Sequence, residues 1–167
     1  HFSGTCAEFV TAPVAHLVKK PHNIDHNHAA GVPLAGLTAW QAIETGGLRS
    51  GQTALIHAAA GGVGHFAVQI AKNIGAKVIA TASARNEDFV MSLGADEFID
   101  YTATEVSDVV SGADFVFHTI SGSMIPKSIA CLKPDGYLSV VEGPLNPDDA
   151  VAAGVRGSFI NVHPDET

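Results

Sequence analysis

Apolar positions along the chain follow two spacings, that of short buried strands and that of amphipathic helices. Six short apolar or β-branched runs predict strands: TALIHA, KVIATA, EFID, DFVFHTI, YLSVVE and GSFINV. Between these runs apolar residues recur at intervals of three and four, most clearly over residues 66–74. This alternation predicts an α/β fold of the Rossmann type, a doubly wound parallel six-stranded sheet with helices on both faces.

Glycine, asparagine and proline positions predict where several of these elements end. The stretch GVPLAGLTAWQAIETGG predicts a helix that starts near Gly31 and ends at Gly46 or Gly47. Asn86 is expected to cap a further helix, which Gly94 ends, and PDG predicts a turn before the strand YLSVVE.

Residues 1–29 have a different texture from the rest of the chain. One short apolar run is followed by a polar stretch with several His and Asn, which predicts a strand and a connector. We therefore divide the chain into residues 1–29 and a Rossmann domain over residues 30–163. The string HNIDHNH contains His22, His26 and His28, and we interpret it as a solvated linker because zinc needs converging ligands and no cysteine lies nearby. No metal site is expected.

Composition and charge narrow the class of protein. The chain has 167 residues, of which 46% are hydrophobic and 16% charged, as expected for one globular domain. Nine scattered basic residues against 17 acidic ones argue against nucleic-acid binding. With no apolar run of about 20 residues and no signal-peptide pattern, we expect no membrane association and a cytoplasmic location. Cys6 and Cys131 are expected as reduced thiols, although a single disulfide is an open alternative. Trp40 and the phenylalanines are expected in the core.

The loop AAAGGVG is the strongest chemical signal in the sequence. It directly follows a predicted strand and opens a predicted helix, which is the context that the dinucleotide-binding fingerprint requires. Two registers fit: one over Ala59, Gly61 and Gly64, and one over Gly62, Gly64 and Ala67. We prefer the first because its leading residue sits directly after the strand. The alternative is a tight βα turn that binds nothing.

The end of the second strand bears on the choice of cofactor. An NAD-binding version of this fold places a carboxylate there for the ribose 2′-hydroxyl, whereas this chain has Ser83 and Arg85 in the sequence ATASARN. A guanidinium and a hydroxyl suit a 2′-phosphate, which predicts NADPH. The alternative for Arg85 is a solvated surface charge.

Several motifs together resemble a known family. GLTAWQAI, AAAGGVG, LGADEFIDY and DFVFHTISG resemble the cofactor-binding domain of the medium-chain dehydrogenase/reductase superfamily, in its zinc-free quinone oxidoreductase and enoyl reductase branch. GTCAEFVTAP and HLVKKP resemble the end of that family's GroES-like catalytic domain. The resemblance implies that residues 1–29 are a short remnant of the catalytic domain and that the chain is truncated from a longer enzyme.

The resemblance also implies roles for individual residues. Thr38 would lie near the cofactor phosphate and nicotinamide ribose, the glycine loop would bind the pyrophosphate, and Tyr101 would join Ser83 and Arg85 at the 2′-phosphate. The segments after the fourth and fifth strands would line the nicotinamide side. The full set of expected cofactor-binding residues is Thr38, Gly61, Gly62, Val63, Gly64, Ser83, Arg85, Tyr101, His118, Thr119, Ile120, Val141, Glu142 and Gly143.

The implied activity is NADPH-dependent hydride transfer to a quinone or an α,β-unsaturated carbonyl compound. The catalytic residues are unknown, because the resemblance implies that they lie in the part of the enzyme that this chain lacks. A non-catalytic nucleotide-binding or protein-interaction module with the same fold is the alternative. A homodimer paired through the last strand, GSFINV, is also expected.

Overall fold

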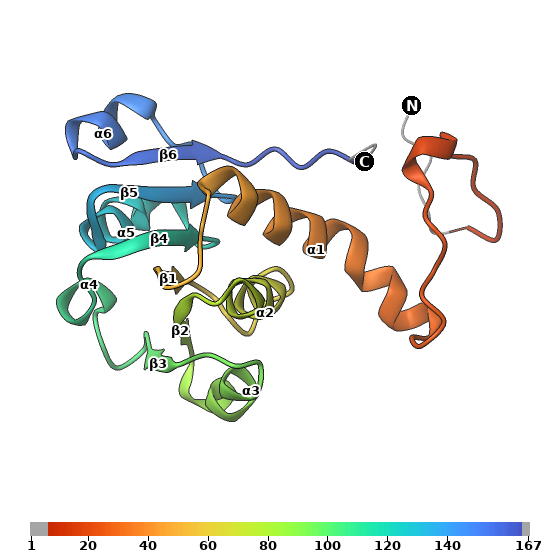
Figure 1. Ribbon diagram of the computed structural model, residues 1–167, viewed down its shortest axis with the longest axis horizontal. Coiled ribbons are helices and arrows are strands. Elements are labelled where there is room, and N and C mark those ends of the chain that lie inside the picture. Colours follow the sequence, from red (N-terminus) through yellow and green to blue (C-terminus); the bar gives the residue numbers. More distant parts are fainter. Residues whose placement is uncertain (1–6, 165–167) are drawn as a thin grey trace.

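A six-stranded sheet forms the centre of the computed structural model, which describes residues 7–164, without the side chain of Pro147. All strands pair in parallel, in the order β3-β2-β1-β4-β5-β6 (Figure 1). The strands are β1 (Thr53–Ile56), β2 (Lys77–Ala82), β3 (Glu97–Asp100), β4 (Ala113–His118), β5 (Leu132–Val140) and β6 (Arg156–Phe159). All six expected strands and the fold class are confirmed.

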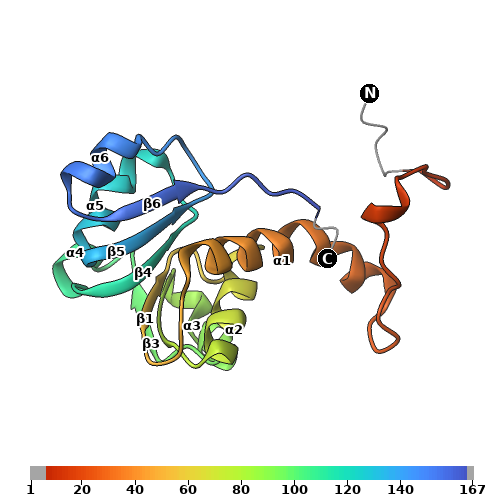
Figure 2. The ribbon, with the colours of Figure 1, turned by 45° about the horizontal axis from the view of Figure 1, so that its top comes forward.

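Helices cover both faces of the sheet. They are α1 (His26–Gly46), α2 (Gly64–Ile74), α3 (Glu87–Ser92), α4 (Val106–Val109), α5 (Ile125–Ala130) and α6 (Pro147–Ala152), with short 3-10 turns at Val14–His16, Ala84–Asn86 and Gly122–Met124. The helices α1, α2 and α3 share one hydrophobic cluster with the sheet, and α4, α5 and α6 share the other. Figure 2 shows the sheet between these two groups of helices.

Successive residues of a strand belong alternately to the two hydrophobic clusters. In β1, Ala54 and Ile56 face α1 and α2, whereas Leu55 faces the side of α4 and α5. Both faces of the central strands are therefore buried, and this explains why the sequence shows continuous apolar runs instead of an alternation with polar residues.

The first helix begins earlier than expected. It starts at His26 because Asp25 caps it, accepting a hydrogen bond of 2.8 Å from the His28 N–H, and it continues through Pro33. The connector assigned to residues up to 29 is therefore partly helical. Residues 7–25 contain no strand, only the 3-10 turn, so the expectation of a strand is wrong for the described part of that segment. Residues 1–6 lie outside the described residues.

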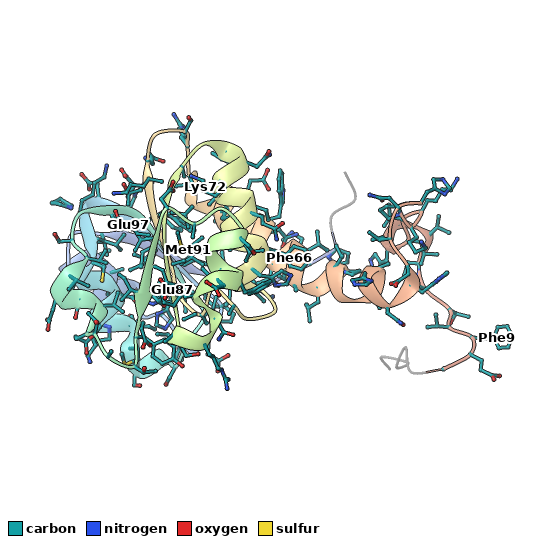
Figure 3. All side chains as sticks on the ribbon, turned by 90° about the horizontal axis from the view of Figure 1, so that it is seen from below. Phe9, Phe66, Lys72, Glu87, Met91 and Glu97 are labelled. Carbon is teal, nitrogen blue, oxygen red and sulfur yellow. The ribbon has the colours of Figure 1, made fainter. Side chains whose placement is uncertain are left out.

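The N-terminal segment and the first half of α1 project from the rest of the molecule (Figures 1 and 2). Figure 3 shows Phe9 at the far end of this segment, away from Phe66 on α2. Phe9 is 91% exposed and Trp40 is 51% exposed, so the expectation that all these aromatic residues pack in the core is wrong. Phe115 and Phe117 do lie in the core.

Two local expectations also differ from the structure. The Asn86 side chain does not cap α3, because its Nδ2 donates to Ser83 Oγ at 3.0 Å instead. The PDG segment lies inside β5, where Asp135 has a φ of 62° and the pairing with β4 shifts register.

Two further findings concern the expected location and redox state. Within residues 7–164, none of the helices combines the length and the apolarity that crossing a bilayer requires. The Cys131 thiol is free and buried. Its possible partner, Cys6, lies outside the described residues.

Candidate functional site

The carboxyl ends of the strands gather the expected ligand-binding segments at one edge of the sheet. The chain order reverses between β1 and β4, which is where open α/β sheets bind ligands. A cavity of about 350 Å³ lies here, between α1, the glycine loop and the segments after β4 and β5. Its lining residues are Leu34, Thr38, Ala58, Gly61, Gly62, Val63, Gly64, Thr119, Val141 and Glu142. We name it the glycine-loop cavity.

The three glycines of the loop have different surroundings. A Cβ built on Gly64 would lie 2.2 Å from the backbone oxygen of Ala58, so only glycine lets α2 start this close to the end of β1. A Cβ on Gly61 would lie 3.1 Å from the same oxygen, whereas one on Gly62 would meet nothing within 4 Å. In the fingerprint the last glycine serves close packing of helix and strand. This geometry supports the register over Ala59, Gly61 and Gly64.

The loop presents unused hydrogen-bond donors at the start of α2. Within the part of the chain that the structure describes, the N–H groups of Gly62 and Val63 donate to no acceptor, and Val63 caps the helix without a side-chain hydrogen bond. These donors lie at the positive end of the eleven-residue helix. Free N–H groups at a helix N-terminus bind anions, so a pyrophosphate fits this position.

Thr38 is positioned by α1 at the opposite wall of the glycine-loop cavity. It is 7% exposed, and its Oγ1 donates to the backbone oxygen of Leu34 at 2.6 Å. The hydroxyl proton is thus used within the helix, and the oxygen keeps its capacity to accept a hydrogen bond.

A second cavity, of about 360 Å³, lies on the α4 and α5 side of the same edge. Two of the expected residues, Tyr101 and Ile120, line it. The other lining residues were missed by the sequence analysis: His57, Ala58, Thr81, Thr104, Glu105, Val106, Ser107, Ser121, Met124, Lys127, Ser128 and Cys131. We name it the hydroxyl cavity, after its serine and threonine side chains.

Strand periodicity could have found part of the hydroxyl cavity. Ile56 and Ala80 face α1 and α2, and they directly precede His57 and Thr81 in the sequence. The strand period of two therefore puts His57 and Thr81 on the α5 side.

The rim of the hydroxyl cavity carries an ion pair. Glu105, just before α4, pairs with Lys127 of α5, and this hydrogen bond lowers the pKa of the Glu105 carboxyl. Below the rim, burial raises the pKa of the Cys131 thiol to about 11, so that thiol stays protonated and unreactive at neutral pH.

Ser83, Arg85 and Tyr101 lie near one another, beyond the ends of β2 and β3. Ala82 and Asp100 are paired across these strands, and the Tyr101 N–H donates to the backbone oxygen of Ala82 at 3.3 Å. Arg85 is exposed, and within residues 7–164 its guanidinium has no hydrogen bond or ion pair. A free guanidinium is therefore available at this corner for an anion.

Asp100 is a charged neighbour at this corner that the sequence analysis missed. Its carboxylate accepts hydrogen bonds from the N–H and the hydroxyl of Thr102, at 3.0 and 2.8 Å, and these bonds lower its pKa. The Ala84 backbone, beside Ser83 and Arg85, also lowers this pKa, so the carboxylate is negative at neutral pH and lies close to that segment.

Three of the residues expected on the nicotinamide side are not among those that line the glycine-loop cavity. The His118 side chain is fully buried and forms hydrogen bonds with Ser128 and Ser121, so it does not line the glycine-loop cavity. Ile120 lines the hydroxyl cavity instead. Gly143 has a φ of 82° and packs on Gly122, where a Cβ on Gly143 would lie 2.8 Å from the Gly122 Cα. Within the described residues, no cluster of His, Cys, Asp and Glu could hold a metal ion.

Comparisons with known proteins show which family the chain resembles. A family model described as "Zinc-binding dehydrogenase" matches residues 62–158. A "Chloroplast envelope quinone oxidoreductase homolog" of Arabidopsis thaliana is 45% identical over 136 residues, which are 75% of this chain and 41% of that protein.

Solved structures of two similar proteins share the fold of this chain. The quinone oxidoreductase of Coxiella burnetii superposes with a TM-score of 0.80 at 33% identity, over 89% of this chain and 48% of the other. A mycobacterial protein solved with NADPH superposes with a TM-score of 0.76 at 28% identity, over 86% of this chain and 48% of the other. The chain thus spans less than half the length of these relatives.

Proposed function

Because the chain belongs to the zinc-binding dehydrogenase family, we propose that it is the cofactor-binding domain of an oxidoreductase that uses NADPH. The resemblance to the quinone oxidoreductase and enoyl reductase branch of the medium-chain dehydrogenase/reductase superfamily is confirmed by the same comparisons. The proposed boundary stays at residues 29 and 30, with residues 30–163 as the cofactor domain. The activity of the whole protein, its substrate and its compartment are proposals.

One observation carries the proposal: the glycine-loop cavity joins free N–H groups at the start of α2 to Thr38 and to the ends of β4 and β5. We assign the pyrophosphate to Gly62 and Val63, because Gly62 has no Cβ to hinder close approach and the N–H groups of both residues are free. The nicotinamide half is assigned to the remainder of this cavity, beside Thr119, Val141 and Glu142.

The adenosine half is assigned to the hydroxyl cavity. Ile120 and Met124 offer apolar surface for the base, and the hydroxyl groups of Thr104 and Ser107, which lie outside the buried histidine pair, offer hydrogen bonds. At the corner beside this cavity, Ser83 and Arg85 would bind the 2′-phosphate, with Tyr101 next to them.

When bound, NADPH supplies the hydride, and we propose a quinone or an α,β-unsaturated carbonyl compound as its acceptor. The relatives' names support this class of substrate, since they are quinone oxidoreductases and an "alkenal/one oxidoreductase". The task of this chain is to hold the nicotinamide in a fixed orientation, because hydride transfer depends on proximity.

The cofactor preference is tested by calorimetry with NADPH and NADH. We expect NADPH to bind at least about tenfold more tightly, because the Arg85 guanidinium gains a charge-assisted contact that NADH does not offer. Arg85→Ala removes this preference, whereas Arg49→Ala, an exposed arginine before β1, leaves it intact. An unchanged preference in Arg85→Ala would remove Arg85 from the site.

The reaction is tested with the complete protein from which this chain derives. NADPH consumption is followed with phenanthrenequinone and with an alkenal as acceptors. Binding of NADPH without oxidation by any acceptor would support a non-catalytic nucleotide-binding module.

A cytosol-like compartment stays an expectation, and the free Cys131 thiol is compatible with it.

A further inference from the structure

We infer that His57, Ser128 and His118 form a relay, that is, a chain of hydrogen bonds in which each residue donates to the next. This relay holds the loop after β4 in place for the adenosine half of the cofactor. These three are positioning residues, and their role in binding rests on the proposed function. The loop, residues 119–124, supplies Ile120 and Met124 to the hydroxyl cavity.

The three side chains form a continuous buried chain between β1, α5 and β4. His57 Nε2 lies 3.1 Å from Ser128 Oγ, and Ser128 Oγ lies 2.9 Å from His118 Nδ1. The exposed fractions are 5% for His57, 1% for Ser128 and 0% for His118. His118 is fully buried, so its ring nitrogens depend on Ser128 and Ser121 for their partners, whereas His57 and Ser128 also border the hydroxyl cavity.

The chemistry of the last partner fixes the direction of the relay. His118 Nε2 lies 3.2 Å from the backbone oxygen of Ser121, which can only accept, so Nε2 carries the proton. In the neutral ring Nδ1 is then an acceptor, and it must receive the hydroxyl proton of Ser128. Ser128 Oγ in turn accepts from His57 Nε2–H.

The same logic continues to the next strand. His57 Nδ1 is left as an acceptor, and Thr81 Oγ1, at 3.3 Å, is the donor that faces it. A second bond ties the loop to β1, because the Thr119 hydroxyl donates to the backbone oxygen of His57 at 2.9 Å. The relay thus connects the ends of β2, β1 and β4 to the loop that lines the hydroxyl cavity.

Burial keeps both rings neutral at neutral pH. Burial is the main cause that lowers the pKa of each histidine, and for His57, lowered to about 4, the second cause is repulsion from His118. The surrounding titratable groups are Glu142 after β5, which opposes the shift of His118, and four groups at the hydroxyl cavity: Tyr101, Glu105, Lys127 and Cys131. The relay in the direction given therefore persists at neutral pH.

The first test removes the central hydroxyl with Ser128→Ala. The matched control is Ser139→Ala, because Ser139 is equally buried and its hydroxyl has no partner within the described residues. Calorimetry with 2′,5′-ADP, a probe of the adenosine end alone, should show about fivefold to tenfold weaker binding for Ser128→Ala and no change for Ser139→Ala. Equal binding by the two variants would overturn the positioning role.

The second test reads the direction itself. Nitrogen chemical shifts of the imidazole rings in the free protein should identify both His57 and His118 as neutral Nε2–H tautomers. His57→Gln, which keeps a donor toward Ser128, should bind 2′,5′-ADP better than His57→Asn, which keeps only the acceptor toward Thr81. An Nδ1–H tautomer at His57, or the reverse order of the two variants, would overturn the relay.

The two tests separate the relay from the proposed function. If the wild-type protein binds neither NADPH nor 2′,5′-ADP, the proposed function fails, and the relay loses its role in binding. The tautomers still decide whether the relay exists. If Ser128→Ala does not fold, the comparison of the two His57 variants decides the positioning role.

Discussion

Alanine substitutions at Gly64 and at Gly62 should separate the two tasks of the glycine loop. At Gly64 the new methyl group would lie 2.2 Å from the Ala58 oxygen, and ordinary contact begins at 3.4 Å. The start of α2 must therefore move by about 1 Å against a backbone that hydrogen bonds to Phe117 of β4 and Thr81 of β2 hold in place. At Gly62 the methyl group meets no protein atom and instead occupies the surface assigned to the pyrophosphate.

The expected magnitudes follow from these distances. Overpacking of this kind costs about 3 kcal/mol, and in a domain of this size that lowers the melting temperature by about 6 to 12 °C. Gly62→Ala should change the free energy of unfolding by less than about 0.5 kcal/mol. It should weaken NADPH binding by at least about tenfold, because the pyrophosphate loses its close approach to the backbone.

Thermal unfolding followed by circular dichroism, and calorimetry with NADPH, measure both effects on the same samples. Gly31→Ala is the control, because Gly31 lies in exposed α1 with nothing within 4 Å of a built Cβ. The reasoning is refuted if Gly64→Ala melts with the wild type, or if Gly62→Ala binds NADPH as tightly as Gly31→Ala does.

Three other expected outcomes concern pH, the first helix and assembly. The folded pKa of His57, about 4, lies below its ordinary 6.5, so between these values the unfolded chain binds the extra proton. The free energy of unfolding should then fall by about 3 kcal/mol as the pH drops through this range. His118, whose pKa is also lowered, adds to this loss. Urea midpoints that match at pH 7 and pH 4.5 would contradict this expectation. Asp25→Ala should remove the N-cap of α1 and destabilise the start of that helix by about 1 kcal/mol. Amide hydrogen exchange at His28 should become faster in Asp25→Ala, whereas Asp25→Asn should keep the protection. The exposed edge strand β6 should pair two copies, and sedimentation that shows only monomer at micromolar and higher concentrations would argue against the homodimer.

The sequence predicted the sheet because each strand is a short apolar run with a helix or a turn on either side. The strand Lys77–Ala82 matches the expected KVIATA, and Glu97–Asp100 matches EFID. Prediction failed where a tertiary contact or a single cap overrides the local pattern. The local pattern predicts a helix start near Gly31, whereas the Asp25 cap begins the helix five residues earlier, at His26.

The glycine-loop cavity was largely predictable, and the hydroxyl cavity was not. The glycine loop is contiguous in sequence, and Thr38 and the segments after β4 and β5 came with the family resemblance. The hydroxyl cavity is built from residues that lie far apart in the sequence, such as Thr81, Thr104 and Ser128, and these residues carry no local motif.

The position of the His118 side chain has a physical origin in the two faces of the sheet. Phe117 packs in the cluster that contains α1 and α2, so the next residue, His118, must project to the α5 side, whereas the glycine-loop cavity lies on the α1 side. Proximity in sequence to a ligand-binding loop therefore does not place a side chain in the cavity. The same geometry puts the side chains of His57, Thr81 and His118 on one face at three strand ends, and only there can a single serine of α5 bond to two of them.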